Sequence, residues 1–385
     1  MKITVLCSDL GVRIPGTKGA SLHLASISSA LAAAGHEVQL VGVAGHGAPP
    51  AEVVSVLLAH PGRSEGEARA RAKLAFTDRL LTVVSAAVDA FEPDLVYERL
   101  ALFGTAGMRL AAASGVPHVV EINALLVQEE AQWRGLHLAD DAQARESAVL
   151  DRAELRVAVS DELAAAVAQV AQGPTVVVPN GVELALFSQP RNRGEARRAL
   201  GLPQHAHIAC FTGSLRPWHG LDIALRSLAL APSTRLLIAG DGDVRPQLEA
   251  LAAELGIVDR VTWLGQVPHG DVATVLAASD VALAPYPPLA HFPFSPLKLY
   301  EYLAAGVPVI ASDVGQVRSV LGDGRFGSLV PAGDVGALAR ALTPRVGALR
   351  DAERGRAYAL EHHGWNRRAE QLGVLFAEVT HAVAR

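Results

Sequence analysis

Four residues in the stretch FSPLKLYEYLAAGVPVIASD (294–313) are of types that could hold a charged, hydroxyl-bearing ligand. Pro296 suits the first turn of a helix, where a missing N–H costs nothing. The free N–H groups of Leu297 and Lys298 would then seat a phosphate, to which Lys298 adds a positive charge. Glu301, one turn further on, can accept two hydroxyl hydrogen bonds, as a ribose would offer. The pattern predicts a nucleotide-diphosphate site, although an ordinary helix with an incidental lysine and glutamate would have the same sequence.

A second loop of the same half, FTGSLRPWHGLDIAL (211–225), also has features of an anion site. Gly213 ends an apolar run that is typical of a strand, and Gly220 precedes a helical pattern. Between them, Arg216 can direct two donors at phosphate oxygens and stays charged at any relevant pH. His219 could add a donor or a partial charge. This loop and the Lys298 helix could therefore clamp one diphosphate.

The first half begins with a comparable junction, SDLGVRIPGTKGASLHL (8–24). Pro15, Gly16 and Gly19 predict a flexible loop that opens a helix at about Ala20, where backbone N–H groups could meet an anionic ligand. A plain turn is the alternative. The loop has neither the dinucleotide fingerprint nor a P-loop, so the use of NAD or ATP is disfavoured.

Two predicted strands of the first half end in polar residues. PHVVEINALL places Glu121 and Asn123 at the carboxyl end of a strand, and DLVYERL does the same for Glu98 and Arg99. Such positions often line the ligand cleft of a parallel α/β sheet. Ion pairing of Glu98 and Arg99 with a loop is the alternative.

A possible metal motif, Asp241-Gly242-Asp243, follows a predicted strand. Paired carboxylates beside phosphates could hold magnesium. Asp-Gly after a strand also makes a tight turn, with Asp243 capping the next helix, and we favour the turn. The chain has no zinc-spaced cluster and no nucleophile elbow, so neither a zinc site nor a hydrolase triad is indicated.

Length and composition indicate a two-domain α/β protein. The chain has 385 residues, half of them hydrophobic, and a net charge of −5, which argues against a general nucleic-acid binder. Its two cysteines, Cys7 and Cys210, lie in apolar strand-like runs and are expected to be free core residues, as in a reducing cytoplasm. No signal peptide or membrane-spanning run is recognisable, and attachment to a membrane surface stays open.

Short, β-branched runs alternate with alanine-rich amphipathic segments along both halves. This alternation predicts doubly wound parallel sheets with helices on both faces. The turn PNG and the charged stretch after it indicate a domain boundary near residue 190. The runs expected to be strands are KITVLC, EVQLVGV, VVSVLL, DLVYE, PHVVEI, LRVAVS and TVVVP in the first half, and HIACFTG, RLLIAG, VTWLG, VALAPY, VPVIAS and GSLVP in the second.

In their order, these motifs resemble those of the retaining glycosyltransferases of family 4, which have the GT-B fold. The resemblance covers nearly the whole chain. It implies two Rossmann-like doubly wound domains facing a cleft, with an acceptor-side domain at 1–188, a sugar-nucleotide domain at 189–363 and a C-terminal helix at 364–385 that crosses back. It rests on KGASLHL, LAAAGHEV, VAVS, PNGVELALF, GSLRPWHG, IAGDGD, VTWLGQV, SDVALAPY and SPLKLYEYLAAGVPVIASDVG.

The resemblance also implies roles for individual residues. Glu301 would bind the ribose hydroxyls, and the backbone around Leu297 and Lys298 would bind the diphosphate. The implied base contacts are Gln266 and Val267, and Gly19 would approach the donor phosphate. Other implied donor contacts are Gly16, Lys18, Gly213, Ser214, His219, Gly240, Ser295 and Pro296; acceptor-side residues are His23, Glu98 and Arg99; catalytic residues are Arg216, Lys298, Asn123 and Glu121.

Three departures from the family pattern bear on these roles. Pro293 stands where the family often has a glutamate that contacts the transferred sugar. Ser214 and His219 stand at the usual arginine and lysine positions, so Arg216 and Lys298 would supply the phosphate charge. Asn123 aligns with a common histidine, which makes Glu121 a candidate for orienting the acceptor.

The expected reaction is retaining transfer of a sugar from a nucleotide-diphosphate donor, with UDP favoured, to an unidentified small-molecule acceptor. No cofactor or metal is expected, because fixed cations and amide dipoles would stabilise the leaving diphosphate. A non-catalytic sugar-nucleotide binder and an epimerase of the same fold are the alternatives. The sequence does not indicate the oligomeric state.

Overall fold

The computed structural model describes residues 1–189, 191–289, 292 and 295–383. Pro293, where the family pattern has its first glutamate, lies outside the described residues. The chain divides into two compact units. Unit 1 takes residues 1–180, Ser295 and 365–383, and unit 2 takes 181–189, 191–289, 292 and 296–364.

Unit 1 is built on a parallel sheet whose strands run in the order β2-β3-β1-β5-β6-β7-β8, with β4 paired to β3. The order reverses between β1 and β5, so the carboxyl ends of these two strands flank the switch point of the sheet. The strands are β1 (Lys2–Cys7), β2 (Arg13–Ile14), β3 (Glu37–Ala44), β4 (Val54–Leu58), β5 (Leu95–Arg99), β6 (His118–Ile122), β7 (Leu155–Ala158) and β8 (Thr175–Val177).

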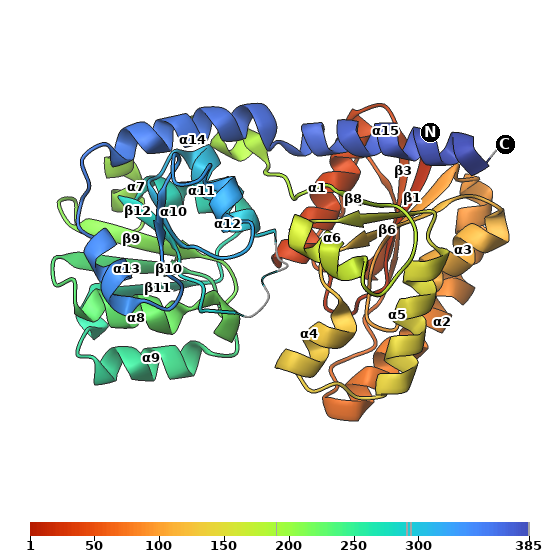
Figure 1. The fold of residues 1–385 in the computed structure, drawn as a ribbon, viewed down its shortest axis with the longest axis horizontal. Helices are drawn as coiled ribbons and strands as arrows, with labels where there is room; N and C mark the ends of the chain where they lie inside the picture. The colour runs from red at the N-terminus through yellow and green to blue at the C-terminus, as the bar shows by residue number, and fades with distance from the viewer. Residues whose placement is uncertain (190, 290–291, 293–294, 384–385) are drawn as a thin grey trace. The chain divides into compact units, whose positions relative to one another are not determined.

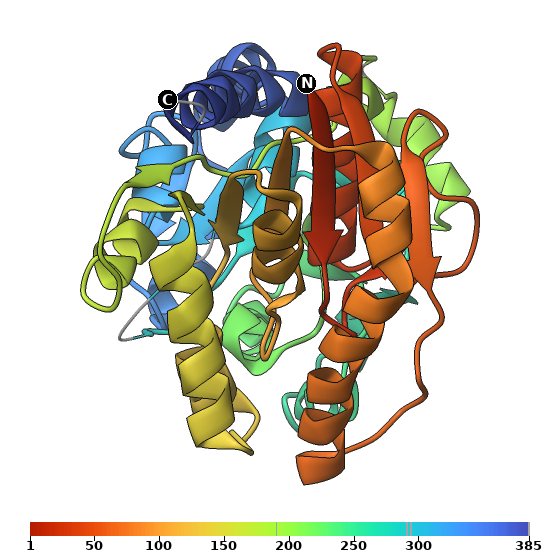
Figure 2. The ribbon, with the colours of Figure 1, turned by 90° about the vertical axis from the view of Figure 1, so that its right-hand side faces the viewer.

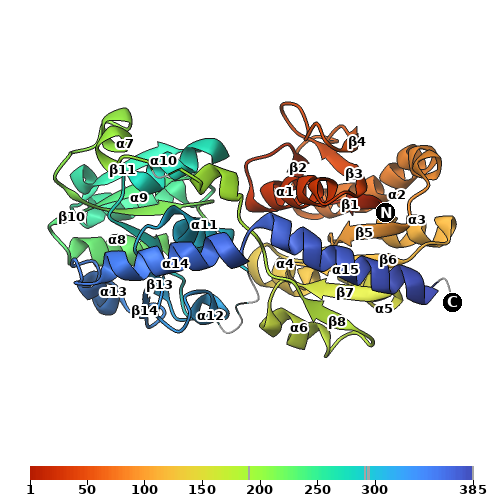
Figure 3. The same cartoon turned by 90° about the horizontal axis from the view of Figure 1, so that it is seen from above.

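Helices cover the sheet of unit 1, with α2, α3 and α5 in front of it in Figure 2. One core cluster joins β1 and β3 to α2 and α3 through residues such as Leu6, Val41 and Leu80. The last helix, α15, packs against α1 within the same unit (Figures 1 and 3). The helices are α1 (Gly19–Ala33), α2 (Gly66–Phe91), α3 (Ala106–Ser114), α4 (Leu126–Trp133), α5 (Ala139–Arg152), α6 (Asp161–Val167) and α15 (Trp365–Val383).

Unit 2 has a parallel sheet in the order β11-β10-β9-β12-β13-β14. Renumbered within the unit, this is the 3-2-1-4-5-6 order of a Rossmann-like domain, and its switch point lies between β9 and β12. The strands are β9 (His207–Thr212), β10 (Thr234–Ala239), β11 (Val261–Gly265), β12 (Val281–Ala284), β13 (Val309–Ser312) and β14 (Ser328–Val330).

The core of unit 2 lies between this sheet and its helices, where Phe211, Leu225, Ile238 and Leu248 are buried together. The helices are α7 (Arg193–Ala199), α8 (Leu221–Ala229), α9 (Arg245–Glu254), α10 (Val272–Ala277), α11 (Leu297–Ala305), α12 (Val317–Val320), α13 (Val335–Ala341) and α14 (Ala348–His362), with short 3-10 turns η1 (Leu184–Phe187), η2 (Pro217–His219), η3 (Val258–Arg260) and η4 (His269–Asp271).

The structure confirms the predicted fold class, because the expected apolar runs form the strands of two parallel α/β sheets. Cys7 and Cys210 are free and buried. Two local predictions are wrong. Pro296 is the N-cap of α11 and not part of its first turn, and Asp243 does not cap α9, whose N-cap is Val244 without a side-chain bond. Among the described helices, none has the length and apolar character needed to cross a bilayer.

Candidate functional site

Lys298 is a buried cation at the switch point of unit 2. It lies on α11 and is 8% exposed. Its Nζ lies 4.0 Å from the centroid of the Phe211 ring on β9 and 5.6 Å from that of Tyr286, which follows β12. Among the described residues, Nζ has no hydrogen-bond partner. In the described part of the chain, the ammonium group thus contacts two ring faces, at the edge where ligands of this fold class bind.

The environment of Lys298 disfavours its charge. Burial lowers the pKa of Lys298 to about 7, and the negative charge of Glu301 opposes this only in part. A buried polar group without a partner raises the free energy of the folded state. An anion at Nζ would remove this penalty, so Lys298 fits a site whose ligand is negatively charged.

Two glycines bring the loops after β9 and β10 close to this ammonium group. A β-carbon on Gly213 would lie 3.4 Å from Lys298 Nζ, and one on Gly240 would lie 1.9 Å from the carbonyl oxygen of Gly213. Both glycines have positive φ angles, 126° and 153°. Only glycine, which has no β-carbon, allows the two loops to lie this close with these φ angles. No side chain of these two residues therefore covers the backbone beside Lys298, which stays open to a ligand.

His219 follows Gly213 on the η2 turn, and its Nδ1 donates to the carbonyl oxygen of Ser214 at 2.5 Å. Burial and the positive charges of Lys298 and Arg216 hold the pKa of His219 well below its usual value. His219 is therefore neutral at pH 7, with Nδ1–H occupied by the loop. It thus adds no positive charge at this position.

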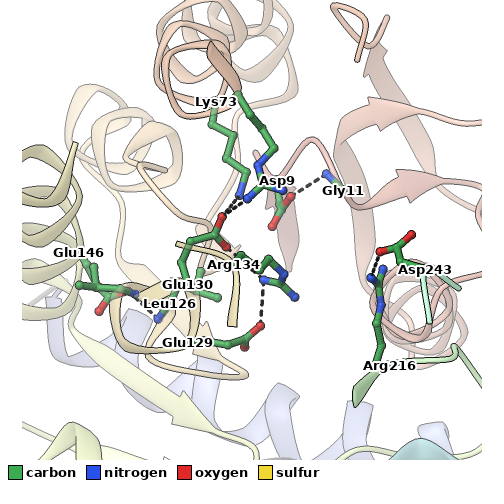
Figure 4. Close-up of polar contacts among 12 residues, drawn as sticks. Asp9, Gly11, Lys73, Leu126, Glu129, Glu130, Arg134, Glu146, Arg216 and Asp243 are labelled. Atoms are coloured by element: carbon green, nitrogen blue, oxygen red, sulfur yellow. Dashed lines mark hydrogen bonds and ion pairs between the residues drawn. The ribbon is translucent and has the colours of Figure 1, made fainter. Parts of the chain in front are cut away.

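Arg216, the other predicted phosphate ligand, has a carboxylate partner of its own. Its guanidinium donates to Asp243 Oδ2 at 2.5 Å, as Figure 4 shows. Asp243 is largely exposed, so water screens this ion pair. The turn that carries Asp243 thus positions Arg216, a contact that the sequence analysis missed.

Glu301 and the segment after β11 lie in the same unit. Glu301 Oε1 accepts from His269 Nε2 at 2.8 Å. Gln266 is exposed and Val267 is partly buried; both precede the η4 turn that carries His269. The sequence analysis missed His269, which lies 32 residues from Glu301 and belongs to no recognisable motif.

Ser295, the residue before Pro296 in the sequence, makes its contacts within unit 1. Ser295 is buried, its Oγ accepts from the Asn180 N–H at 3.2 Å, and its carbonyl oxygen accepts from Asn180 Nδ2 at 2.7 Å. Pro296 and Leu297 follow in unit 2, where Leu297 begins α11. Ser295 is thus tied to the Asn-Gly turn that ends the continuous part of unit 1.

Glu121 lies in unit 1 at the carboxyl end of β6 and accepts hydrogen bonds from four side chains. His23 Nε2 lies 2.8 Å from one carboxylate oxygen, which Tyr97 also contacts, and Arg99 lies 2.9 Å from the other, which Asn123 contacts. Burial alone would raise the pKa of Glu121, but the charges and hydrogen bonds of His23 and Arg99 outweigh it and hold this pKa far below its usual range.

Glu98, expected on the acceptor side, is fully buried. Its carboxylate accepts from the N–H groups of Gly107 and Met108, at 3.1 and 3.2 Å, in the first turn of α3. His118 Nε2 contacts the same carboxylate at 3.0 Å. Glu98 therefore fixes α3 against the sheet, and its oxygens do not face solvent.

The loop after β1 holds the three remaining predicted donor contacts. Lys18 is the N-cap of α1, Gly19 is its first residue, and Gly16 packs against the Arg13 carbonyl. Lys18 Nζ donates to the carbonyl oxygen of Gly11 at 3.2 Å. This hydrogen bond links the N-terminus of α1 to the residues that follow β1, and so restricts the loop between them.

A charged cluster near the carboxyl edge of unit 1 appears in no predicted motif. Arg134 lies 3.0 Å from Glu129 and 3.1 Å from Glu130, both on α4 (Figure 4). Lys73 Nζ, on α2, lies 3.9 Å from Glu130, and Arg69 of the same helix also contacts this carboxylate. Three cations thus meet the carboxylates of Glu129 and Glu130, and the negative charge of Asp9 also acts on Arg134. The cluster joins segments some 60 residues apart, so local spacing could not reveal it.

Within the described part of the chain, no group of three or more His, Cys, Asp or Glu residues could hold a metal ion. Asp241 and Asp243 do not converge, because Asp241 accepts from the Gly242 N–H and Asp243 pairs with Arg216. The Asp-Gly-Asp segment is thus a turn in this structure.

Two family models match the chain. One is described as Glycosyltransferase Family 4 and matches residues 17–186, and the other is described as Glycosyl transferases group 1 and matches residues 192–344. The D-inositol 3-phosphate glycosyltransferase of Thermomonospora curvata is 32% identical over 93% of this chain and 90% of its own length. This chain belongs to the family 4 glycosyltransferases.

Further relatives and solved structures support the same family and the same fold. The D-inositol 3-phosphate glycosyltransferase of Streptosporangium roseum is 33% identical over 74% of the chain and 70% of its own length. The structure of sucrose-phosphate synthase from Thermosynechococcus elongatus superposes with a TM-score of 0.83 at 25% identity, covering 99% of each chain. HepE from Anabaena, solved in complex with UDP-glucose, shares the fold with a TM-score of 0.75 at 20% identity, over 98% of this chain and 100% of its own. The glycosyltransferase therefore has the GT-B fold.

Proposed function

We propose that this glycosyltransferase transfers a sugar from a UDP-sugar to its acceptor with retention at the anomeric carbon. The observation that carries the proposal is the buried ammonium group of Lys298 at the switch point of unit 2, for which the described residues supply no hydrogen-bond partner. A diphosphate would supply the missing negative charge. The HepE complexes with UDP and UDP-glucose make UDP the first nucleotide to test.

In the proposed donor site, the N–H groups at the start of α11 and the Lys298 ammonium group bind the diphosphate. Arg216 adds charge to the same oxygens once its exposed pair with Asp243 opens. Glu301 accepts from the ribose hydroxyls, and Gln266 and Val267 lie against the base. The remaining donor contacts proposed are the segment Ser295–Leu297 and the loops that carry Gly16, Lys18, Gly19, Gly213, Ser214, His219 and Gly240.

Negative charge develops on the diphosphate as the glycosidic bond breaks. Lys298 and the helix N–H groups stabilise this charge because they are already oriented toward it, and Arg216 joins them once its pair with Asp243 has opened. The acceptor hydroxyl attacks on the face from which the diphosphate leaves, and a leaving phosphate oxygen takes its proton. This route needs no nucleophilic side chain. Asn123, held by Glu121, would face the reacting sugar as a neutral group.

For the acceptor we propose a small phosphorylated polyol bound by unit 1. The side chains of Arg69, Lys73 and Arg134, which pair with Glu129 and Glu130 in the ligand-free protein, are the cations proposed to meet its phosphate. The relatives named D-inositol 3-phosphate glycosyltransferase make an inositol phosphate the first acceptor to test. Glu98 has no place in this proposed acceptor site, because its carboxylate is fully buried.

We propose that the domains divide these tasks as the family pattern implies, with the donor on 189–363 and the acceptor on 1–188. The helix at 364–385 completes the acceptor-side domain, in agreement with the contact of α15 with α1. The buried free cysteines agree with a reducing compartment, so we propose a cytoplasmic location.

The decisive experiment has two stages. A panel of nucleotides and sugar nucleotides is screened by thermal shift, because a true donor stabilises the folded state by mass action. The donor found is then incubated with inositol phosphates and other polyols, and the anomeric configuration of the product is read by NMR. An inverted product would refute retention. Stabilisation without transfer or hydrolysis would identify a non-catalytic binder, and release of a free sugar with a changed configuration at a non-anomeric carbon would identify the epimerase alternative.

A further inference from the structure

His269 and Glu301 form a pair, but the proposed function gives a role to Glu301 alone. His269 Nε2 lies 2.8 Å from Glu301 Oε1, and the two side chains are 23% and 14% exposed. His269 begins the η4 turn, a few residues after β11, whereas Glu301 lies in the middle of α11. The pair therefore fixes the orientation of one carboxylate from a different element of unit 2.

The contact leaves Glu301 able to bind a diol. A carboxylate has about four acceptor positions on its two oxygens, and His269 occupies one of them. As far as the described residues go, Oε2 and the second position of Oε1 stay available for two neighbouring hydroxyl groups. A glutamate side chain loses rotational freedom when it is fixed, and this loss opposes binding. Because His269 fixes it before the ligand arrives, this loss does not weaken binding.

Charges around the pair favour an imidazole that donates to Glu301. Burial lowers the pKa of His269, but the hydrogen bond and charge of Glu301, together with the charge of Glu183, raise it overall. Lys298 lies on the same helix as Glu301 and is its other charged neighbour, and Asp271 is the remaining charged residue of the η4 turn. Nε2 donates in the imidazolium form and in one neutral tautomer, so the contact persists in both.

We propose that His269 is the positioning residue for the ribose-binding carboxylate of Glu301, so that it acts on nucleotide affinity through the ribose hydroxyls alone. The inference rests on the proposed function, in which Glu301 receives the ribose. It assigns to the segment after β11 a positioning role besides the contact with the base proposed for Gln266 and Val267. His269 itself need not touch the ligand.

Calorimetry with UDP and with 2′,3′-dideoxy-UDP tests the proposal on the full chain. We expect His269→Ala to weaken UDP about 3- to 10-fold, the equivalent of ordering one side chain, and to leave dideoxy-UDP unchanged. His269→Gln, whose amide can still donate to Glu301, should restore much of the UDP affinity. The double variant His269→Ala/Glu301→Ala should bind UDP as weakly as Glu301→Ala alone, because the two residues act as one unit.

The outcomes separate two failures. Equal weakening of both ligands by His269→Ala, or no weakening of either, would show that His269 is only a packing contact and would overturn this inference while the nucleotide site stands. Failure of the unaltered protein to bind UDP, GDP or pyrophosphate would remove the proposed function and this inference with it. Thermal unfolding of each variant without ligand reports on folding independently.

Discussion

The ammonium group of Lys298 lies 4.0 Å from the centroid of the Phe211 ring, and the described residues offer it no hydrogen-bond acceptor. Phe211 is wholly buried on β9, so Lys298 reaches across the carboxyl end of the strand that borders the switch point. A positive charge over a ring face is favourable, but less so than one in contact with an anion. In the proposed donor site, the diphosphate would supply the anion that this ammonium group does not find among the described residues.

Replacing Lys298 should separate binding from stability. We expect Lys298→Met to reduce turnover about 100-fold or more, because a charge that stabilises the leaving group is lost. The same change should raise the free energy of unfolding of the ligand-free protein at pH 7, because a poorly solvated charge is removed. Lys2→Met is a matched control, since Lys2 also lies over a phenylalanine ring, Phe91, but on the surface of unit 1. Turnover in Lys298→Met equal to that of the control would refute the phosphate assignment.

Ligand binding should be coupled to a proton at Lys298. Because burial lowers the pKa of this group to about 7, most of it is neutral at pH 8 and charged at pH 6. A bound diphosphate favours the charged form and raises the pKa, so UDP binding should take up nearly one proton at pH 8 and much less at pH 6. Calorimetry at each pH in two buffers of different ionisation enthalpy measures this uptake. An uptake that persists in Lys298→Met would assign the proton to another group.

The ion pair of Arg216 with Asp243 gives a second test of the donor site. The pair is largely exposed, so Arg216→Ala and Asp243→Ala should each change the free energy of unfolding by less than about 1 kcal/mol. Arg216→Ala should still lower kcat about 100-fold, whereas Asp243→Ala should keep kcat and bind the nucleotide at least as tightly, because Arg216 is released. Steady-state kinetics and calorimetry distinguish the two variants. Equal loss of kcat in both would mean that Arg216 acts only through its partner.

Glu121 should set part of the acid stability of unit 1. Its folded-state pKa is depressed, so its contribution to stability is complete above the ordinary carboxyl pKa near 4.5 and is lost as the pH falls. Glu121→Gln should destabilise the protein by about 3 kcal/mol at pH 7, because His23 and Arg99 lose their carboxylate. The difference between variant and parent should shrink below pH 4.5. Denaturant titrations at several pH values check this, and a difference independent of pH would contradict it.

The sequence could predict the sheets and the charged start of α11, because these depend on apolar runs and on spacings of a few residues. It could not predict the environment of Glu121, because β6 receives partners from α1 and β5 only once the strand order β1-β5-β6 is set. The sequence could not predict the pairs of His269 with Glu301 and of Arg216 with Asp243 either, since their residues lie 32 and 27 positions apart. The sequence predicts which polar side chains stand at strand ends. Which residues these side chains contact depends on the order of the strands in the sheet.

A buried carboxylate that holds α4 gives a last prediction. Glu146 on α5 accepts from the N–H groups of Leu126 and Val127, at 2.8 and 3.1 Å, and so caps the helix that carries Glu129 and Glu130. Burial raises the pKa of Glu146 to about 7, and the two N–H groups oppose this only in part. Between pH 4.5 and 7 the folded state therefore holds a proton that the unfolded state has lost, so stability should fall as the pH rises through this range.

Two substitutions of Glu146 separate the cap from its charge. Glu146→Gln keeps an oxygen for both N–H groups and removes the titration, so its stability should match or exceed that of the parent at pH 8 and vary less between pH 5 and 7.5. Glu146→Ala removes both the cap and the titration, so it should be about 1 kcal/mol less stable than Glu146→Gln at every pH. Denaturant titrations across this range measure both. If Glu146→Gln were as unstable as Glu146→Ala at pH 8, the negative charge itself would be what stabilises the start of α4, and the helix N-terminus would outweigh the effect of burial.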